Sequence, residues 1–499
     1  MSAINSFNSR KSIFVRAISK HLRHIALHHH IDGRRQSPMW FSFLQNVKWS
    51  DFYWAKGVSC LAKHAKCLFL SRRIVGILML LAVITYLAST VSAASHSVRD
   101  FGAVGDGKTL DTVAIQNALD TVANDGGGEV LIPAGRYITG SLILKSHATL
   151  RLEEGATLFG SPNPNDYPII RARWEGIETN CHRALISANA AEDITITGLG
   201  VIEGCPKVGQ LRNPRGPTVI EFNECTNVCV EEVTIKSSRM WTLHPAYCHN
   251  VRILRVTVET TGSNSDGIDP DSCQMVLIDG CTFSTGDDNI AIKSGKGQEG
   301  ARIGRPCEDI VITNCTFLKG YTSIAFGSEL SGGIRRVHIS NCTFKQGRAA
   351  LQFKSRSGRG AYLEDITADH LVVGPEPLLE MTTNYRFNPD PQGVPGIAGL
   401  TRFSNIRISD VQIDAKQLMS VEGTTEKPVD GLYISRVTGT VAAGSDIQHA
   451  SNVVLADIRL DGISGPHYFT NNVSGIGFKS AAPINERPSQ KDKSLADAH

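Results

Sequence analysis

The sequence has no C-x-x-C pair and no His and Cys residues at zinc-ligand spacing. Structural zinc sites are built from such pairs, so we expect no metal and no cofactor. Net charge is also nearly absent, because 51 Lys and Arg oppose 48 Asp and Glu. Proteins that bind nucleic acids usually carry a strongly basic surface. We therefore expect no nucleic-acid partner.

The net positive charge is concentrated at the N-terminal end of the chain. Residues 1–73 hold 13 Lys and Arg against 2 Asp, about +11, which leaves about −8 for the rest. An uncharged run, residues 74–94, follows Arg72 and Arg73 and ends in Ser92, Ala93 and Ala94. This pattern is typical of a secretory signal cleaved near Ala93 or Ala94, but the run is also long enough to span a bilayer.

We therefore predict a basic, low-order extension over residues 1–73 and a signal peptide or signal-anchor over residues 74–94. Cleavage would release the protein to the extracellular space or cell wall. Without cleavage, the positive residues would stay in the cytosol and the protein would be a type II membrane anchor of the secretory pathway. Membrane contact is expected only in that second case.

The rest of the chain repeats itself. The segment Cys281-Thr-Phe-Ser-Thr-Gly286 recurs as residues 315–320 and 342–347 in the form Cys-Thr-Phe-x-x-Gly. A second column of cysteines is followed three residues later by Val or Ile, at Cys225, Cys248, Cys273 and Cys307. Self-similarity of variable period with β-branched residues indicates a solenoid with loop insertions. We predict an all-β fold, a right-handed, single-stranded parallel β-helix over residues 95–480.

In such a fold the cysteines are small apolar side chains stacked inside the coil, and we expect at most two disulfides. One helix is predicted, from Thr109 to about Ala123, with Asp111 near its start and Asp125-Gly-Gly-Gly128 after its end. An amphipathic helix there would cap the open first coil, which otherwise exposes unpaired strand edges.

Residues 481–499 are polar and lack periodicity, so we predict a disordered tail. Three sites match the N-glycosylation pattern, Asn314, Asn341 and Asn472. The first two occupy equivalent repeat positions and are expected to be buried turn residues. Only Asn472 is predicted to be an acceptor, and we expect a monomeric glycoprotein.

Acidic residues gather in residues 256–295. Asp266 lies in NSDG, and Asp287 and Asp288 lie in TGDDN, 21 and 22 residues later. This spacing is about one coil, and successive coils lie about 4.8 Å apart, so we expect the three carboxyl groups to lie side by side. They would repel one another, so at least one should have a raised pKa and supply an acid beside a base. Each motif taken alone is also an ordinary turn sequence.

Several segments together resemble glycoside hydrolase family 28, the polygalacturonases, and in particular the branch with GSE followed by SGG. They are NSDGIDPDSC, TGDDNIAIKSG, IGRP, FGSELSGG and FKSRSGRG, after an opening DFGAVGDGKTLDT. The resemblance covers residues 97–480 and implies hydrolysis of α-1,4-galacturonan in pectic polysaccharide with inversion and without a metal. It implies that Asp287 is the general acid and that Asp266 and Asp288 activate water, at the wide carboxyl separation that inversion requires.

The chain departs from the family pattern in two places. Where the family has Gly-His-Gly, this sequence reads Gly320-Tyr321-Thr322, and where the family has Arg-Ile-Lys it reads Gln352-Phe353-Lys354. In the family the Arg and Lys hold the substrate carboxylate, and Gln lacks the charge and the planar fork of Arg. Our substrate-binding candidates are Lys354, Gln352, Lys293, Arg356, Tyr385 and His244.

Each candidate has a simpler explanation. The lysines and the arginine are equally typical of solvated surface charges. His244 could simply be packed beside Trp241. Tyr385 is expected to be a sugar-stacking platform only if it lies in the cleft. We lean towards exo action, with the insert between Lys293 and Cys307 closing one end. The alternatives are hydrolysis of rhamnogalacturonan or xylogalacturonan, a catalytically weak β-helix that binds pectin, and calcium-dependent elimination.

Overall fold

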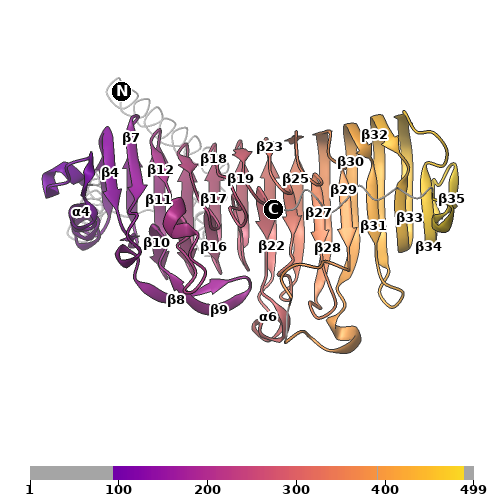
Figure 1. The fold of residues 1–499 in the computed structure, drawn as a ribbon, viewed down its shortest axis with the longest axis horizontal. Coiled ribbons are helices and arrows are strands. Elements are labelled where there is room, and N and C mark those ends of the chain that lie inside the picture. Colours follow the sequence, from indigo (N-terminus) through magenta and orange to yellow (C-terminus); the bar gives the residue numbers. More distant parts are fainter. Residues whose placement is uncertain (1–93, 390–391, 488–499) are drawn as a thin grey trace, which may run out of the picture. The chain divides into compact units, whose positions relative to one another are not determined.

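The computed structural model describes residues 94–389 and 392–487, which wind into the predicted right-handed parallel β-helix (Figure 1). The predicted extension and all but the last residue of the predicted signal segment lie outside these residues. Within the described part of the chain, no helix is long and apolar enough to cross a membrane. Strands of successive coils pair in parallel, and the exception is one antiparallel hairpin.

The strands stack into three columns. The first column contains β1 (Ala94–Ser97), β3 (Gly128–Ile132), β6 (Ala148–Leu152), β11 (Glu192–Gly198), β14 (Thr226–Glu231), β17 (His249–Leu254), β19 (Gln274–Asp279), β22 (Cys307–Thr313) and β25 (Ile334–Ser340). The second contains β2 (Asp106–Leu110), β4 (Gly135–Thr139), β7 (Ala156–Gly160), β12 (Val201–Glu203), β15 (Thr234–Lys236), β18 (Thr257–Glu259), β20 (Thr282–Ser284), β23 (Thr316–Lys319) and β26 (Thr343–Phe344). Both continue in longer strands, β28 (Tyr362–Val373), β30 (Arg402–Gln417), β32 (Val429–Ala443) and β33 (Ser445–Asp461).

The third column carries the acidic motifs. It contains β5 (Leu142–Ile143), β10 (Ile186–Asn189), β13 (Ile220–Asn223), β16 (Leu243–Ala246), β21 (Ile290–Ile292), β24 (Ile324–Phe326), β27 (Leu351–Lys354), β29 (Leu379–Thr382), β31 (Met419–Glu422), the first residues of β33, β34 (Tyr468–Ile476) and β35 (Ala481–Pro483). Single β-bridges from Leu243 to Ile268 and from Ile268 to Ile290 carry the column across the segment between β16 and β21. The coil is therefore continuous through the acidic motifs.

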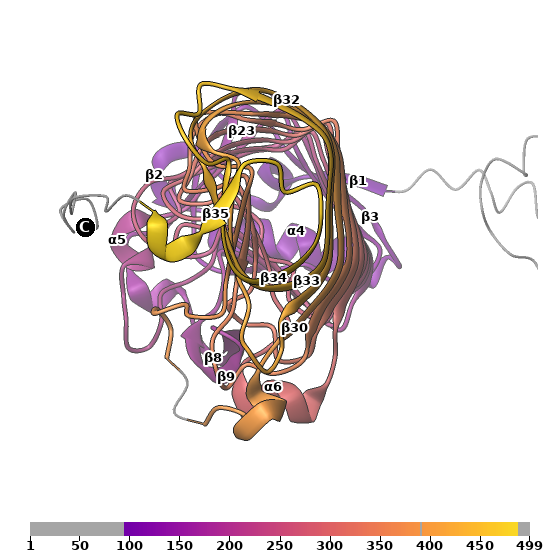
Figure 2. The same ribbon diagram turned by 90° about the vertical axis from the view of Figure 1, so that its right-hand side faces the viewer.

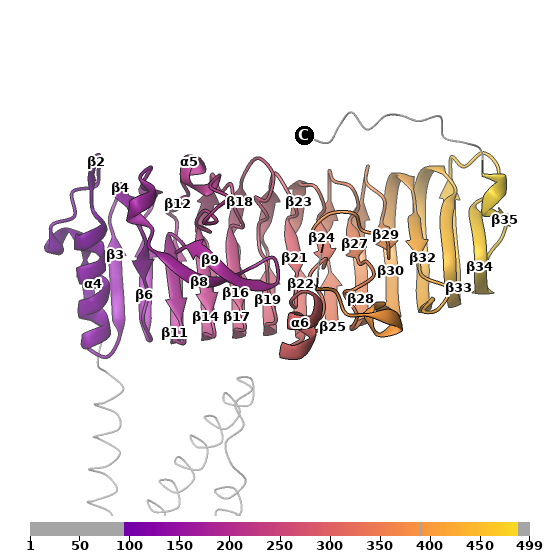
Figure 3. The same ribbon diagram turned by 60° about the horizontal axis from the view of Figure 1, so that its bottom comes forward.

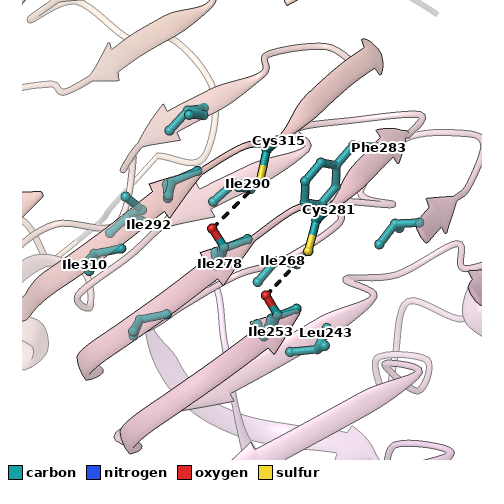
Figure 4. Close-up of a cluster of buried hydrophobic side chains, with 14 of the residues drawn as sticks. Leu243, Ile253, Ile268, Ile278, Cys281, Phe283, Ile290, Ile292, Ile310 and Cys315 are labelled. Atoms are coloured by element: carbon teal, nitrogen blue, oxygen red, sulfur yellow. Dashed lines mark hydrogen bonds between the residues drawn. The ribbon is translucent and has the colours of Figure 1, made fainter. Parts of the chain in front are cut away.

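The interior of the coil is filled by stacked side chains of the same kind (Figure 4). Phe317 stacks between Phe283 and Phe344, with ring centroids 5.2 and 4.9 Å apart. The thiols of Cys281 and Cys315 donate to carbonyl oxygens one coil earlier. All ten cysteines that the structure describes are free. The prediction that the repeat cysteines point inward is confirmed.

The predicted capping helix is α4 (Thr112–Asn124). It begins three residues later than predicted, because residues 106–110 pair with β4 as strand β2. Its buried face, which includes Ile115, Leu119 and Val122, covers the first coil (Figure 2). Covering the open end removes apolar interior and strand edges from water.

Two local predictions are wrong. Residues 481–487 are not disordered, since β35 pairs with β34 and a 3-10 helix follows at Ile484–Glu486. Asn314 and Asn341 are exposed rather than buried, although they do occupy turns. Both have a left-handed φ, 55° and 54°, a conformation that Asn tolerates better than most residues. The turn signal was therefore right and the inferred burial was not.

The antiparallel hairpin β8 (Ile169–Trp174) and β9 (Ile177–His182) and the helix α6 (Gly297–Ile303) project from the same side of the coil (Figure 2). Figure 3 shows the hairpin running towards α6. A second apolar cluster lies under the hairpin, formed by Ala172, Trp174, Cys181, Met240 and Trp241. The indole rings of Trp174 and Trp241 are 4.2 Å apart. The hairpin is thus fixed to the coil at the third column.

Candidate active site

The third column brings the three aspartates together. Asp266 lies two residues before Ile268, and Asp287 and Asp288 lie three and two residues before Ile290, the first residue of β21, which bridges to Ile268. The Gly267 amide donates to the Asp288 carbonyl oxygen at 2.9 Å, which ties the two segments together. All three carboxyl groups line one cavity of about 360 Å³.

Asp287 is partly exposed to the cavity. Burial, followed by the neighbouring charge of Asp288, raises the pKa of the Asp287 carboxyl. Its Oδ2 accepts from the Asn264 amide at 2.7 Å and its Oδ1 accepts from the Asp288 amide at 3.1 Å. These bonds fix the orientation of a carboxyl group that holds its proton more tightly than an exposed one.

Asp288 faces a cation. Lys354 on β27 donates from Nζ to Asp288 Oδ2 at 2.5 Å, and both side chains are buried. The neighbouring carboxylates Asp288 and Asp287 contribute to raising the pKa of Lys354, so its ammonium group stays charged. A charge-assisted bond of this kind stabilises an ionised carboxylate. The cavity therefore combines a carboxyl group whose pKa is raised, Asp287, with one that bonds to an ammonium group, Asp288.

Asp266 lies against a buried group of charges. Burial raises its pKa well above the usual value, and the nearby charges of Asp269 and Asp287 raise it further. Lys293 acts in the opposite direction, with Nζ 3.7 Å from Asp266 Oδ2 and 3.3 Å from Asp269 Oδ1. The same ammonium group is 3.7 Å from Glu329 Oε2 and 4.5 Å from the Trp241 ring centroid.

Three of the six predicted binding residues line the cavity, Lys354, Lys293 and Tyr385. Tyr385 lies beside Lys354, whose Nζ is 5.6 Å from the ring centroid. Burial raises the pKa of Tyr385 to about 12, so its hydroxyl remains protonated. These three side chains therefore face the same cavity as the three aspartates.

The other three candidates do not line the cavity. Gln352 is buried and accepts from Thr322 Oγ1 at 2.7 Å. His244 is packed against Trp241, with ring centroids 4.9 Å apart, and its Nδ1 lies 3.5 Å from Glu221. Arg356 is part-buried, and its Nη1 has no hydrogen-bond partner within the described residues. For His244 the simpler explanation, a packed histidine, is the one observed.

Several lining residues were missed by the sequence analysis, namely Glu175, Trp241, Asn264, Tyr321, Ser328, Glu329, Phe387 and Asn388. Glu329 and Ser328 belong to the FGSELSGG motif, and Tyr321 occupies the position of the family histidine. These motifs could therefore have identified the three residues as site candidates. Glu175 and Asn388 come from the hairpin tip and from the segment after β29, outside the repeat. No periodic pattern marks them.

Three distant segments meet at one side of the cavity. The Lys296 amide donates to the Gly176 carbonyl oxygen at the hairpin tip, at 3.3 Å. Lys296 Nζ donates to Asn388 Oδ1, and Asn388 Nδ2 donates to Glu329 Oε1, both at 2.7 Å. A Cβ on Gly176, whose φ is +78°, would lie 2.7 Å from Lys296 Cβ, so only glycine permits this approach. The contacts form a wall, which we call the hairpin wall (Glu175–Gly176, Lys296 and Asn388).

The charges of the lining side chains are unequal. Five carboxyl groups line the cavity, those of Glu175, Asp266, Asp287, Asp288 and Glu329, against two ammonium groups, those of Lys293 and Lys354. Both lysines already lie within ion-pair distance of carboxylates. Two carboxyl groups in unlike environments that face one cavity can serve as an acid that protonates a leaving oxygen and a base that activates a water molecule. That is the chemistry that hydrolysis of an acetal requires.

Comparisons with known proteins agree with this geometry. The family model described as glycosyl hydrolases family 28 matches residues 126–374. A probable polygalacturonase of Vitis vinifera is 32% identical over 417 residues, which are 79% of this chain and 84% of that protein. The exo-poly-alpha-D-galacturonosidase of Dickeya chrysanthemi is 27% identical over 292 residues, 48% of each protein.

Solved structures are similar as well. A hyperthermoactive exopolygalacturonase from Thermotoga maritima has a TM-score of 0.60 and 28% identity, over 76% of this chain and 91% of that one. The family 28 exopolygalacturonase of Yersinia enterocolitica has a TM-score of 0.66 at 24% identity, over 77% and 78%, and shows the same fold. With the Vitis relative matched over most of both sequences, this chain belongs to glycosyl hydrolases family 28 and is a glycoside hydrolase.

Proposed function

We propose that the protein hydrolyses α-1,4-galacturonosyl linkages in pectic polysaccharide, by a single displacement that inverts the anomeric carbon. The proposal is supported by the polygalacturonase names of its relatives and by one structural observation, the three aspartates of two adjacent coils in one cavity. We also propose that the mature protein is secreted, because pectic polysaccharide is found outside the cell.

In this mechanism Asp287 donates its proton to the glycosidic oxygen as the bond to the anomeric carbon breaks. Asp288, whose charge is balanced by Lys354, accepts a proton from the attacking water, and Asp266 holds that water from the adjacent coil. Inversion requires the donor and the acceptor to flank the sugar with room for water between them. Because the carboxyl groups project from two coils, they can flank a sugar in this way.

We further propose exo action. The hairpin wall closes one side of the cavity through three side-chain and backbone contacts, so a long chain would meet an obstacle there. Two similar proteins, from Dickeya chrysanthemi and Thermotoga maritima, are named as exo-acting enzymes. An exo enzyme releases short products from the start of the reaction, whereas an endo enzyme first releases long fragments.

A second substrate class is favoured by the charge of the cavity. Both lining lysines are already paired with carboxylates, and Gln352 brings no positive charge. A free galacturonate carboxylate at the cleavage point would add a sixth carboxyl group to five. Rhamnogalacturonan alternates galacturonate with neutral rhamnose, so one of the two sugars at its cleavage point carries no charge and the repulsion is smaller. Xylogalacturonan keeps the galacturonate carboxylates, and its neutral xylose branches add no further charge.

The test is release of reducing ends from polygalacturonate, rhamnogalacturonan and xylogalacturonan, with products separated by size. We expect release from at least one substrate and loss of about 10³-fold or more in Asp287→Asn, as for removal of a general acid. Asp279→Asn is the matched control, since Asp279 bonds to Asn314 and does not line the cavity. Binding without release would favour a pectin-binding β-helix, and an unsaturated, ultraviolet-absorbing product that a chelator abolishes would favour elimination.

A further inference from the structure

Asp269 is a carboxyl group that the proposed mechanism does not use. It is fully buried and does not line the cavity. The bridges on either side of Ile268 place Asp269 in the third column, level with His244 on the preceding coil and Ala291 on the following one. It therefore lies three residues after Asp266 in the same segment, buried and outside the cavity lining.

The charges around Asp269 are not balanced one to one. Its cationic partner is Lys293, whose Nζ is 3.3 Å from Asp269 Oδ1. That ammonium group is shared with Asp266 and Glu329, each 3.7 Å away. His244 faces Asp269 from the preceding coil, whereas the negative charges of Asp287 and Asp288 act on Asp266. A single ammonium group thus serves three buried carboxyl groups.

This arrangement destabilises the folded state. Each buried charge costs several kcal/mol of desolvation unless it is well paired, and a neutral side chain at position 269 would avoid the cost. Burial raises the pKa of Asp269 to about 6, and Asp269 in turn raises the pKa of Asp266. The Asp269 charge acts on a group that does line the cavity, which gives the buried carboxyl a use beyond packing.

We propose that Asp269 is a positioning residue that acts with Lys293 to set the proton affinity of Asp266. This inference rests on the proposed function in one respect only, that the protonation state of Asp266 controls how it holds the attacking water. Asp269 and Lys293 work in opposite directions. The negative charge makes Asp266 keep its proton at higher pH, and the positive charge makes Asp266 release it at lower pH.

The direct test is a carboxyl ¹³C NMR titration of the full chain labelled at aspartate, with the Asp266 signal assigned by its loss in Asp266→Asn. Asp269→Asn removes the like charge and should lower the Asp266 midpoint by about 1 pH unit or more. Lys293→Met removes the shared cation and should raise that midpoint by a similar amount. In hydrolysis assays the acid limb of the kcat/KM profile of each variant should move in the same direction as the Asp266 midpoint of that variant, to lower pH in Asp269→Asn and to higher pH in Lys293→Met.

Glu308→Gln is the matched control, because Glu308 is a buried carboxylate paired with Arg335 in the first column, away from the cavity. It should leave the Asp266 midpoint unchanged. A midpoint that moves in neither variant, or in the same direction in both, would overturn the proposal even if both variants lost activity. Because the titration needs no substrate, it separates this inference from the proposed function, which fails if the wild type releases no reducing ends.

Discussion

The Glu376 carboxyl group lies buried in the turn before β29, and we expect Glu376→Gln to remove a large pH dependence of stability. Its Oε1 accepts from Ser323 Oγ at 2.9 Å. A Cβ on Gly347 would lie 2.3 Å from its Oε2, so the carboxyl is packed against that residue without room for water. No cation among the described residues lies within ion-pair distance of it.

Burial raises the pKa of Glu376 to about 7 in the folded protein, against about 4.5 for an unperturbed Glu. The folded state therefore holds this proton more tightly than the unfolded state. Its contribution to the free energy of unfolding is complete below about pH 4.5 and is lost as the pH rises through 7. At about 1.4 kcal/mol for each pH unit, the loss is at most about 3.5 kcal/mol.

The assay is urea unfolding of the wild type and of Glu376→Gln at pH 5 and at pH 8. Gln keeps the acceptor for Ser323 and has no proton to lose, so the variant should gain about 2–3 kcal/mol relative to the wild type between the two pH values. Ser323→Ala is a useful control, because it removes the hydrogen bond and keeps the titrating group. Parallel pH profiles of the wild type and Glu376→Gln would refute the reasoning.

Three further predictions concern the cavity. Lys354→Met leaves Asp288 buried without its partner, so unfolding in urea should show a loss of about 3–5 kcal/mol, and unchanged stability would contradict the ion pair. Phe387 is 61% exposed at the cavity rim, so Phe387→Ala should raise KM by roughly 5- to 10-fold through lost stacking. A fall in kcat alone would contradict that role. Arg173→Leu breaks the buried pair with Asp271 next to the hairpin tip, and product chromatography should then show longer oligomers, whereas an unchanged product pattern would argue against the hairpin wall.

The sequence predicted the parts of the fold that repeat. Cysteine and phenylalanine recur at the same position of successive coils, as at Cys281 and Cys315, because an in-register parallel stack places like side chains on like. The same register placed Asp266 near Asp287. Knowing the coil length was enough to bring those motifs into one cavity.

What the sequence could not provide lies outside the repeat. The hairpin tip at Gly176 reaches Lys296, which is 120 residues later in the chain, and no periodicity relates them. Burial was also hard to judge. The side chains of Gln352 and Lys293 point away from the coil interior, a direction that the repeat alone predicts to be exposed. Other parts of the chain cover them, so both side chains are buried. Lys293 lines the cavity, and its binding role stays a prediction, but the sequence did not show that its ammonium group lies among three carboxyl groups.

The most direct test of the account is the configuration of the first product, followed by ¹H NMR during hydrolysis of the preferred α-linked pectic substrate. If Asp287 protonates the leaving oxygen while water is activated from the adjacent coil, the newly formed reducing end appears first as the β-anomer and then mutarotates. An initial α-anomer would require a covalent intermediate and would contradict the single displacement through these three aspartates.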